Sequence, residues 1–331
     1  MRSLLWYILL ACRAVPARGY LTLGTDSKEA DPDFRELKKY ALLSAIAYCA
    51  TVSLPTGPFS GPDARPPASL RDIVVMDVFN FDNFLEIGAG YVALDHQFER
   101  IYLAFKGTSS SADWINNLDF VSIAYTPEVV KNGAYNVSGR CCTKCRVHRG
   151  FMSFMHKSGP AVLDKVVALK DMYPGYQIQV TGHSLGAALA LITAIELRLL
   201  GYDVLVVTLG SPKVGNHEFV RFVDQMFDTP SAEEHIAKHR SFQWLSNGYV
   251  RMVHRHDLIP FLPPFKKYAH AGYEYYLSMG GVTQAPDTIY RRGKSYIEDG
   301  KFDYLNTMLK FRRIEHSNYF LPLSACRHAK A

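Results

Sequence analysis

The sequence predicts a single α/β domain in which helices flank a mostly parallel central sheet. Two observations lead to this prediction. Beyond residue 176, short apolar runs that suit buried strands alternate with longer segments of helical periodicity, and such alternation is typical of a parallel sheet covered on both faces. The chain also has 331 residues, 48% of them hydrophobic and 21% charged, without an internal repeat, which suits one globular unit.

The N-terminus carries the features of a secretory signal peptide. Arg2 precedes an apolar stretch at 4–12, and small residues follow at 15–17. The apolar stretch is too short to span a membrane as a helix. We expect residues 1–19 to be removed on export, with cleavage near their end, so that the domain at 20–331 acts outside the cell.

A bacterial lipoprotein signal at Leu9–Cys12 is the weaker alternative for this segment. No other stretch of the sequence is long and apolar enough to be a transmembrane helix.

The first half of the domain is expected to contain helix, loop and hairpin. Apolar residues at helical spacing predict an amphipathic helix from Asp33 to Cys49, and a Pro-, Gly- and Ser-rich composition predicts a loop at 54–70. The further expected elements are strands at Glu86–Leu94 and Arg100–Phe105 joined by a hairpin, an irregular surface segment at 122–145, and a helix within Phe151–Tyr173 that Gly159-Pro160 interrupts.

The second half of the chain contains the alternation of strands and helices. The expected strands are Tyr176–Thr181, Asp203–Leu209 and Tyr249–His254, and the expected helices are Ser184–Leu200 and Asn216–Phe227. Residues 228–243 are polar and charged and are expected to form an insertion. Three prolines between 260 and 264 predict a rigid loop.

Gly182-His183-Ser184-Leu185-Gly186 indicates a nucleophile elbow. A bare G-x-S-x-G pattern arises by chance in roughly one chain of this size in ten, but here it joins a buried strand to a long helix, as an elbow requires. The turn strains the backbone of Ser184, and the glycines leave no Cβ where strand and helix meet. The helix N-terminus adds N–H groups for an oxyanion. The predicted fold is therefore an α/β-hydrolase with Ser184 as its nucleophile.

A serine nucleophile needs a histidine base and an acid that orients the base. In α/β-hydrolases the chain order is serine, acid, histidine. Asp257 is the best acid, since it follows a strand, and strand-exit loops line the sites of parallel sheets. His316 is the predicted base because it lies on a loop just after an amphipathic helix, where Cys326 can tie the loop down. His270 stays open as the alternative base.

The second donor of an oxyanion hole must come from another loop. Phe105-Lys106-Gly107-Thr108 ends an apolar strand in a Gly-containing turn. The amide of Thr108 is therefore the candidate partner of the Leu185 amide. An ordinary strand-ending turn would have the same sequence.

Export makes the cysteines candidates for disulfides. Five remain after the signal peptide, so one thiol should stay unpaired; they are Cys49, Cys141, Cys142, Cys145 and Cys326. A short-loop bridge is expected, either Cys142–Cys145 or Cys141–Cys145. A zinc knuckle is disfavoured, because no second ligand pair has zinc spacing, and we predict neither a metal nor a cofactor. A sequon at Asn136 agrees with a glycosylated loop of a secreted protein.

The formal net charge of +6 is modest for this length. It is too diffuse to indicate nucleic-acid binding, and no stable protein partner is predicted. It would favour adsorption to an anionic lipid surface, but an ordinary, mildly basic solvated surface explains it equally well.

Taken together, these residues resemble the fungal class 3 triacylglycerol lipases, and most of all the secreted yeast members. The likeness runs from about Phe34 to Cys326 in separate ordered blocks. The blocks are 45–52, 101–120, 142–151, 180–188, 207–216, 251–264 and 314–326.

Position by position, the resemblance implies a triad of Ser184, Asp257 and His316. It also implies an oxyanion hole from Thr108 and Leu185. The cysteine pairs that it implies are Cys49–Cys326 and Cys142–Cys145, with Cys141 left over.

The resemblance also places a short helical lid at Ser111–Leu118, in which Trp114 matches the lid tryptophan. Trp114, Ile115 and Leu118 would share one apolar face. His148 and His183 match family positions and are interpreted as structural hydrogen-bonding residues. Departures at Lys106, Thr108, Ser211 and Lys213 remove no catalytic atom; they concern substrate preference and specific activity, and not the reaction class.

The functional hypothesis is a secreted triacylglycerol lipase that acts on acylglycerols at a lipid–water interface. A soluble or feruloyl-type esterase on the same fold is the alternative, and the apolar lid residues favour the lipase. A catalytically dead binding protein on a hydrolase scaffold is a third hypothesis, which the intact candidate triad disfavours.

Overall fold

The computed structural model describes residues 31–51, 54–59, 70, 72–81, 87–108, 120–131, 142–294 and 313–323. Several predictions fall outside these residues: the signal peptide at 1–19, the lid at 111–118, the sequon at Asn136, and the structural state of Cys141 and Cys326.

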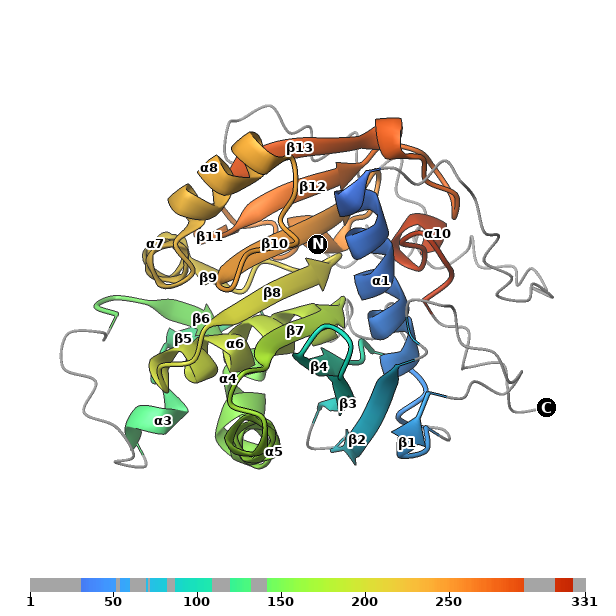
Figure 1. The fold of residues 1–331 in the computed structure, drawn as a ribbon. Coiled ribbons are helices and arrows are strands. Elements are labelled where there is room, and N and C mark those ends of the chain that lie inside the picture. Colours follow the sequence, from blue (N-terminus) through green and yellow to red (C-terminus); the bar gives the residue numbers. More distant parts are fainter. Residues whose placement is uncertain are drawn as a thin grey trace.

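A nine-stranded sheet forms the centre of the molecule, in the order β1-β2-β3-β4-β7-β8-β10-β12-β13 (Figure 1). Its middle, from β4 to β12, is parallel, and both margins are antiparallel. This confirms the predicted α/β class and the parallel centre. The strands are β1 Gly57–Pro58, β2 Ile73–Asn80, β3 Ala89–Asp95, β4 Arg100–Phe105, β7 Gln177–His183, β8 Val204–Leu209, β10 Gly248–His254, β12 Tyr273–Leu277 and β13 Ile289–Lys294.

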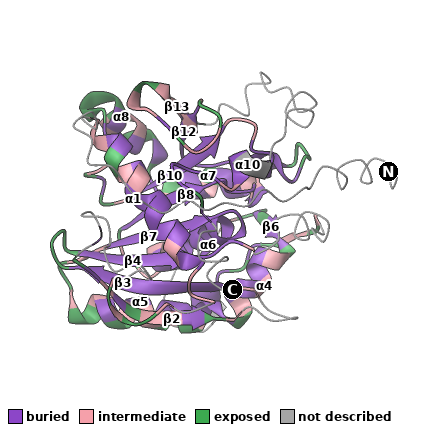
Figure 2. Ribbon diagram, turned by 90° about the vertical axis from the view of Figure 1, so that its right-hand side faces the viewer, coloured by how far each residue is buried: buried purple, intermediate pink, exposed green. Residues whose placement is uncertain are grey.

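Helices cover both faces of this sheet, so its central strands are almost wholly buried (Figure 2). One apolar core joins the sheet to α1 and α8, and the other joins it to α4, α5, α6 and α7. The helices and helical turns are α1 Pro32–Ala47, α3 Glu128–Lys131, α4 Arg149–Lys157, α5 Gly159–Met172, α6 Leu185–Leu199, α7 His217–Met226, α8 Thr229–His239, η3 Ile259–Phe261, η4 Pro286–Thr288 and α10 Arg313–His316.

The first helix is fixed at both ends. Asp31 caps α1 by accepting hydrogen bonds from the N–H groups of Asp33 and Phe34, and Pro32 suits the first helical turn. At the other end, Tyr48 reaches across to His183 at the end of β7. The predicted helix from Asp33 to Cys49 is thus confirmed, and it links the chain start to the edge of the sheet that carries Ser184.

A second, smaller sheet has the order β11-β9-β6-β5. Its strands are β5 Ser122–Ala124, β6 Arg146–His148, β9 Gly215–Asn216 and β11 Tyr268–Ala269. The irregular segment expected at 122–145 therefore contains β5 and α3, and β6 follows it. These strands are only two or three residues long and pair with partners remote in sequence, so local periodicity could not reveal them.

Other expected elements differ in extent. β1, β2, β12 and β13 were not predicted. β1 lies within the loop expected at 54–70, and β2 is interrupted by a bulge between Val75 and Asp77, which breaks its alternation. The expected insertion at 228–243 contains helix α8, capped by Asp228. The predicted interruption at Gly159-Pro160 is confirmed, because α4 ends at Lys157 and α5 restarts at Gly159.

Candidate active site

Ser184 lies between β7 and α6 in a strained backbone conformation, with φ 58° and ψ −125°. A side chain at either flanking glycine would collide with backbone: at Gly182 with Gly186, and at Gly186 with Lys106. A left-handed φ is costly for a serine, so the packing of the surrounding strands must hold it in place. The strand, sharp turn and helix that the motif requires are therefore present.

The three predicted triad residues lie together at the carboxyl edge of the parallel strands. The Nε2 atom of His316 lies 2.9 Å from Ser184 Oγ. On the other side of the ring, Nδ1 lies 3.0 and 2.9 Å from the two carboxylate oxygens of Asp257. All three residues are buried. Because Nδ1 faces only acceptors, it carries the proton, which leaves Nε2 free to accept the hydroxyl proton of Ser184.

Two further donors hold the carboxylate of Asp257. The backbone N–H of Ile259 donates to Oδ1 at 2.9 Å, and the hydroxyl of Tyr319 donates to Oδ2 at 2.6 Å. Burial, together with the charge of Asp257, raises the pKa of Tyr319 well above its ordinary value, so this hydroxyl stays a donor. Each carboxylate oxygen thus has its own protein donor in addition to the histidine, which fixes the orientation of the acid.

A second set of contacts holds the backbone of His316. The Nε2–H of His183 donates to the carbonyl oxygen of His316 at 2.8 Å, and Nδ1 of His183 accepts from the Tyr48 hydroxyl at 2.7 Å. His183 is thus a structural hydrogen-bonding residue, as interpreted from the sequence.

Tyr48 and Tyr319 are site residues that the sequence analysis missed. The sequence could have indicated Tyr319, because it follows His316 by only three residues and its side chain can therefore reach the same site. For Tyr48 no local pattern connects the end of the first helix with the elbow.

His270, the alternative base, lies elsewhere. Its Nε2–H donates to the Pro260 carbonyl oxygen at 2.6 Å. Complete burial lowers the pKa of His270 well below its ordinary value. The structure therefore places His316, and not His270, beside Ser184.

The candidate oxyanion residues flank the elbow. Leu185 is the first residue of α6, where backbone N–H groups have no partner within the helix. The turn that carries Thr108 passes close to Ser184, because a Cβ on the neighbouring Gly107 would lie 3.1 Å from the Cβ of Ser184. The amides named from the sequence thus come from two segments that meet at the nucleophile.

Of the two short-loop disulfides left open by the cysteine spacing, Cys142–Cys145 is the one formed. Cys49 is also disulfide-bonded. Its predicted partner Cys326 lies outside the described residues, so the Cys49–Cys326 pairing stays a prediction.

The comparisons with known proteins agree with this geometry. The family model "Lipase (class 3)" matches residues 102–267, half of the chain. The LIH1 protein of Saccharomyces cerevisiae, which carries a provisional lipase designation, is 35% identical over 249 residues that cover 73% of this chain and 75% of that protein. The chain belongs to the class 3 lipase family.

Other members of the class 3 lipase family show how far the likeness extends. "Secreted mono- and diacylglycerol lipase 2" of Gibberella zeae is 31% identical, over 78% of this chain and 66% of that protein. The crystal structure of the Lip2 lipase from Yarrowia lipolytica superposes with a TM-score of 0.70 at 26% identity, covering 88% of this chain and 95% of that one. This class 3 lipase is thus an α/β-hydrolase and a serine carboxylic ester hydrolase.

Two absences concern the part of the chain that the structure describes. No group of three or more His, Cys, Asp or Glu side chains there could hold a metal ion. None of the helices described there is long and apolar enough to cross a bilayer.

Proposed function

We propose that this class 3 lipase is a secreted triacylglycerol lipase that cleaves fatty-acid esters at lipid–water interfaces through an acyl-enzyme intermediate. The observation that carries the proposal is the 2.9 Å contact between His316 Nε2 and the Oγ of Ser184 on its strained turn.

In the first step, Ser184 Oγ attacks the ester carbonyl carbon while its proton passes to His316 Nε2. The resulting imidazolium keeps its Nδ1–H on Asp257, whose carboxylate stabilises the positive charge. The negative charge that develops on the carbonyl oxygen is held by the amides of Thr108 and Leu185. His316 then gives its proton to the departing alcohol, and the acyl group remains on Ser184.

In the second step, His316 accepts a proton from water, and the hydroxide equivalent attacks the acyl carbonyl. The oxyanion forms in the same place, and collapse of the intermediate returns the proton to Ser184 Oγ as the fatty acid leaves. No cofactor takes part in this sequence of proton transfers.

Interfacial action rests on the segment at 111–118, which we propose to be a lid. An apolar face of Trp114, Ile115 and Leu118 would cover Ser184 in water and find a better apolar partner in lipid. Burying a few large side chains changes the free energy by several kcal/mol, enough to invert a closed–open equilibrium.

Secretion is proposed from the signal peptide at 1–19 and glycosylation from the sequon at Asn136. The Gibberella zeae relative carries the word "secreted" in its name, which supports export for this chain.

A hydrolysis panel on the purified mature enzyme tests the substrate class. Short-chain triglyceride should be cleaved, with a steep rise in rate as its concentration passes the solubility limit, and Trp114→Ala should blunt that rise. Smooth saturation below the limit, or a preference for feruloyl esters, would contradict the interfacial lipase and favour a soluble esterase.

A further inference from the structure

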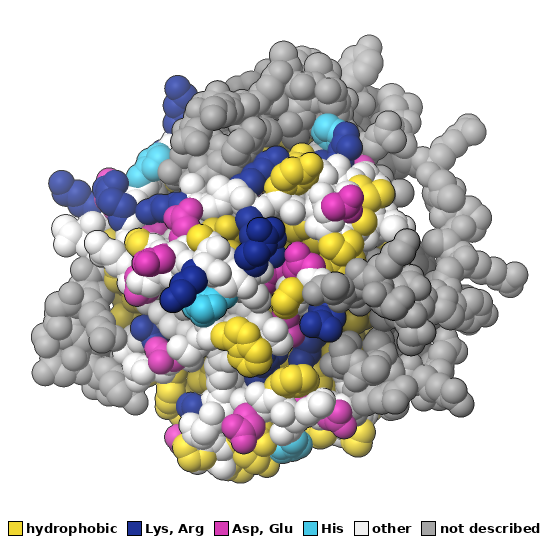
Figure 3. All heavy atoms as spheres, turned by 45° about the horizontal axis from the view of Figure 1, so that its top comes forward, with side chains coloured by type: hydrophobic (Ala, Val, Ile, Leu, Met, Phe, Trp, Pro, Cys, Tyr) yellow, Lys and Arg dark blue, Asp and Glu magenta, His cyan; other side chains and the backbone are white. Residues whose placement is uncertain are grey.

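On the face that includes β13 and α8, charged side chains of opposite sign lie close together. Cations and carboxylates are interspersed there (Figure 3). On β13, three basic side chains each have an acidic partner. The pairs are Arg291 with Asp31 and Asp33, Arg292 with Glu274, and Lys294 with Asp224. Since opposite charges neutralise one another here, this face has little attraction for an anion.

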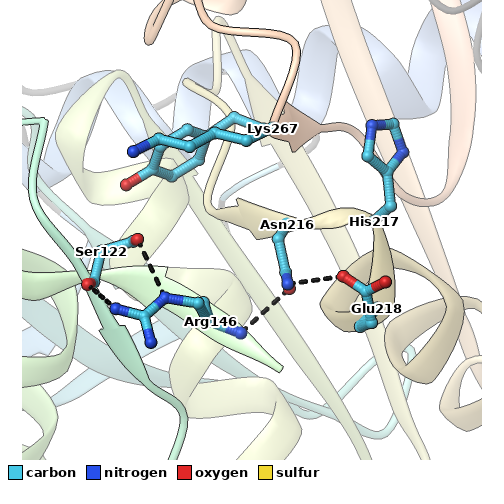
Figure 4. Close-up of a pocket in the computed structure, with 7 residues that line it drawn as sticks. Ser122, Arg146, Asn216, His217, Glu218 and Lys267 are labelled. Carbon is cyan, nitrogen blue, oxygen red and sulfur yellow. Dashed lines mark hydrogen bonds between the residues drawn. The ribbon is translucent and has the colours of Figure 1, made fainter. Parts of the chain in front are cut away.

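The small sheet is different, and it carries a pocket of about 430 Å³. Strands β5, β6, β9 and β11 and the start of α7 supply its lining, and polar side chains converge on it (Figure 4). The lining residues are Ser122, Arg146, Asn216, His217, Glu218, Lys267 and Tyr268. This volume lies within the range of small-ligand sites.

Two cations face this pocket without a carboxylate partner among the described residues. Arg146 is held in place by Ser122, since its Nε–H donates to the hydroxyl at 3.2 Å and its guanidinium also donates to the backbone oxygen. Lys267 extends over the rings of Phe265 and Tyr268, with Nζ 5.6 and 5.7 Å from their centres. A pre-positioned guanidinium, an exposed ammonium and nearby hydroxyls form a donor set that suits a phosphate group.

The surrounding sequence strengthens the positive potential. Neither 142–149 nor 258–273 contains an Asp or Glu, yet these stretches also hold Lys144 and Lys266. Among the described residues of the lining, Glu218 is the acidic one. Its carboxylate accepts hydrogen bonds from the side chains of Asn216 and Arg221, which offsets much of its repulsion.

Exposed apolar side chains beside the pocket point to a lipid source for the anion. Val121 and Phe265 are each 44% exposed, and the ring of Phe265 packs edge-on against Phe120 at 5.5 Å. The backbone ties the two features together, because the Tyr268 hydroxyl donates to the Phe120 carbonyl oxygen at 3.4 Å. Aromatic residues beside unpaired cations match the boundary between acyl chains and anionic headgroups, whereas a free phosphate ion would gain nothing from them.

We propose that the pocket around Arg146 and Lys267 binds the phosphate of an anionic phospholipid headgroup, and that it thereby docks the enzyme on negatively charged lipid surfaces. Phe265 and Val121 enter the interface beside it. The site is separate from Ser184. The phospholipid bound there holds the enzyme at the surface and is not hydrolysed at this site. It deepens the proposed interfacial function, but binding is measurable without hydrolysis, so the two proposals can fail separately.

The test is co-sedimentation of the full mature enzyme with vesicles of ether-linked phosphatidylcholine, with and without ether-linked phosphatidic acid. Ether lipids carry no cleavable ester, so hydrolysis does not disturb the measurement. We expect clear preference for the anionic vesicles. Lys267→Gln should weaken that binding about fivefold, as expected for one cation near a charged membrane.

Matched variants separate a pocket from diffuse charge. Lys238→Gln removes the same charge from α8 and should leave vesicle binding nearly unchanged, whereas Glu218→Gln should strengthen it. Inorganic phosphate should displace the enzyme from vesicles better than chloride at equal ionic strength. Thermal unfolding midpoints check that each variant is folded; Lys267 is exposed, so its replacement should not disturb folding.

Three outcomes would overturn the proposal. Equal losses for Lys267→Gln and Lys238→Gln would mean that only overall charge matters. Equal displacement by phosphate and chloride would exclude a phosphate pocket. Calorimetric binding of inorganic phosphate, combined with no preference for anionic vesicles, would assign the pocket to a soluble phosphate and contradict the lipid source.

Discussion

Polar side chains are buried and paired at the carboxyl edge of the main sheet, but the cations around the pocket of the small sheet are exposed. At the edge, Asp257 and His316 are buried, and the side-chain polar atoms of the triad have directed partners. On the small sheet, Arg146 and Lys267 are exposed and have no carboxylate partner among the described residues. Proton transfer needs fixed geometry and a low dielectric, which only a buried network supplies. Attraction of a charged surface works over several ångströms in water, and salt screens it.

The largest effect on activity should come from replacing a triad residue at the carboxyl edge of the main sheet. Ser184→Ala should lower ester hydrolysis by at least about 10⁴-fold while the thermal unfolding midpoint changes little, because the missing atom takes part in the reaction and not in core packing. His316→Ala should give a loss of similar size. The control is His270→Ala, which should retain most activity in the fraction that folds. The opposite ranking of the two histidine variants would assign the base to His270.

The disulfide at Cys49 tests how the chain ends support that edge. If Cys49 is paired with Cys326, the bridge closes a loop spanning most of the chain, and Cys49→Ala should lower the free energy of unfolding by about 4 kcal/mol. Cys326→Ala should give the same loss. Urea unfolding measures both variants. Non-reducing peptide mapping that joins Cys49 to another cysteine would refute the pairing.

His148, on β6 of the small sheet, is buried and should make the stability of the protein sensitive to acid. Burial lowers the pKa of His148 to about 4, below the ordinary value of 6.5. Between these values the unfolded chain binds a proton that the folded protein does not, so stability present above pH 6.5 is lost as the pH falls. From pH 7 to 5 this group should cost about 2 kcal/mol.

His148→Asn sharpens that measurement. The Nδ1 atom of His148 accepts from the Gly150 N–H at the start of α4, and an asparagine oxygen can take its place as an N-cap. Urea unfolding at pH 7 and 5 should show a smaller loss in the variant than in the parent. Equal losses would mean that His148 does not cause the acid sensitivity.

The smallest effect on activity is expected from removing the hydrogen bond that Tyr319 donates to Asp257. Tyr319→Phe removes the donor to Asp257 Oδ2 but keeps the ring, and kcat should fall about tenfold, which corresponds to one buried hydrogen bond to a charged group. Tyr91→Phe is the matched control, because its buried hydroxyl donates to the Leu43 carbonyl oxygen away from the triad. A comparable fall in kcat for both variants would indicate general loosening of the fold.

The sequence predicted the parts of this comparison that depend on local pattern. The elbow was recognisable because Gly182 and Gly186 flank a serine between an apolar strand and a helix, and both glycines prove necessary on steric grounds. Chain order and strand exits predicted Asp257, which lies in contact with His316.

The features that the sequence did not predict depend on contacts between segments far apart in the chain. Tyr48 reaches His183 across 135 positions, and no periodicity reports such a pairing. The pocket at Arg146 exists because β6 and β9 lie side by side. Composition indicated only a modest net charge. Folding places Arg146 and Lys267, which have no carboxylate partner among the described residues, around one pocket, and it pairs the cations on β13.

Labelling with a fluorophosphonate tests the central claim most directly, because this reagent reacts with a serine only when a base activates it. The folded enzyme should take up one equivalent, peptide mass mapping should locate the adduct on Ser184, and activity should disappear in proportion to labelling. His316→Ala should label far more slowly, and His270→Ala at nearly the parental rate. An active enzyme that stays unlabelled at Ser184, or that loses activity through an adduct on another residue, would contradict the account.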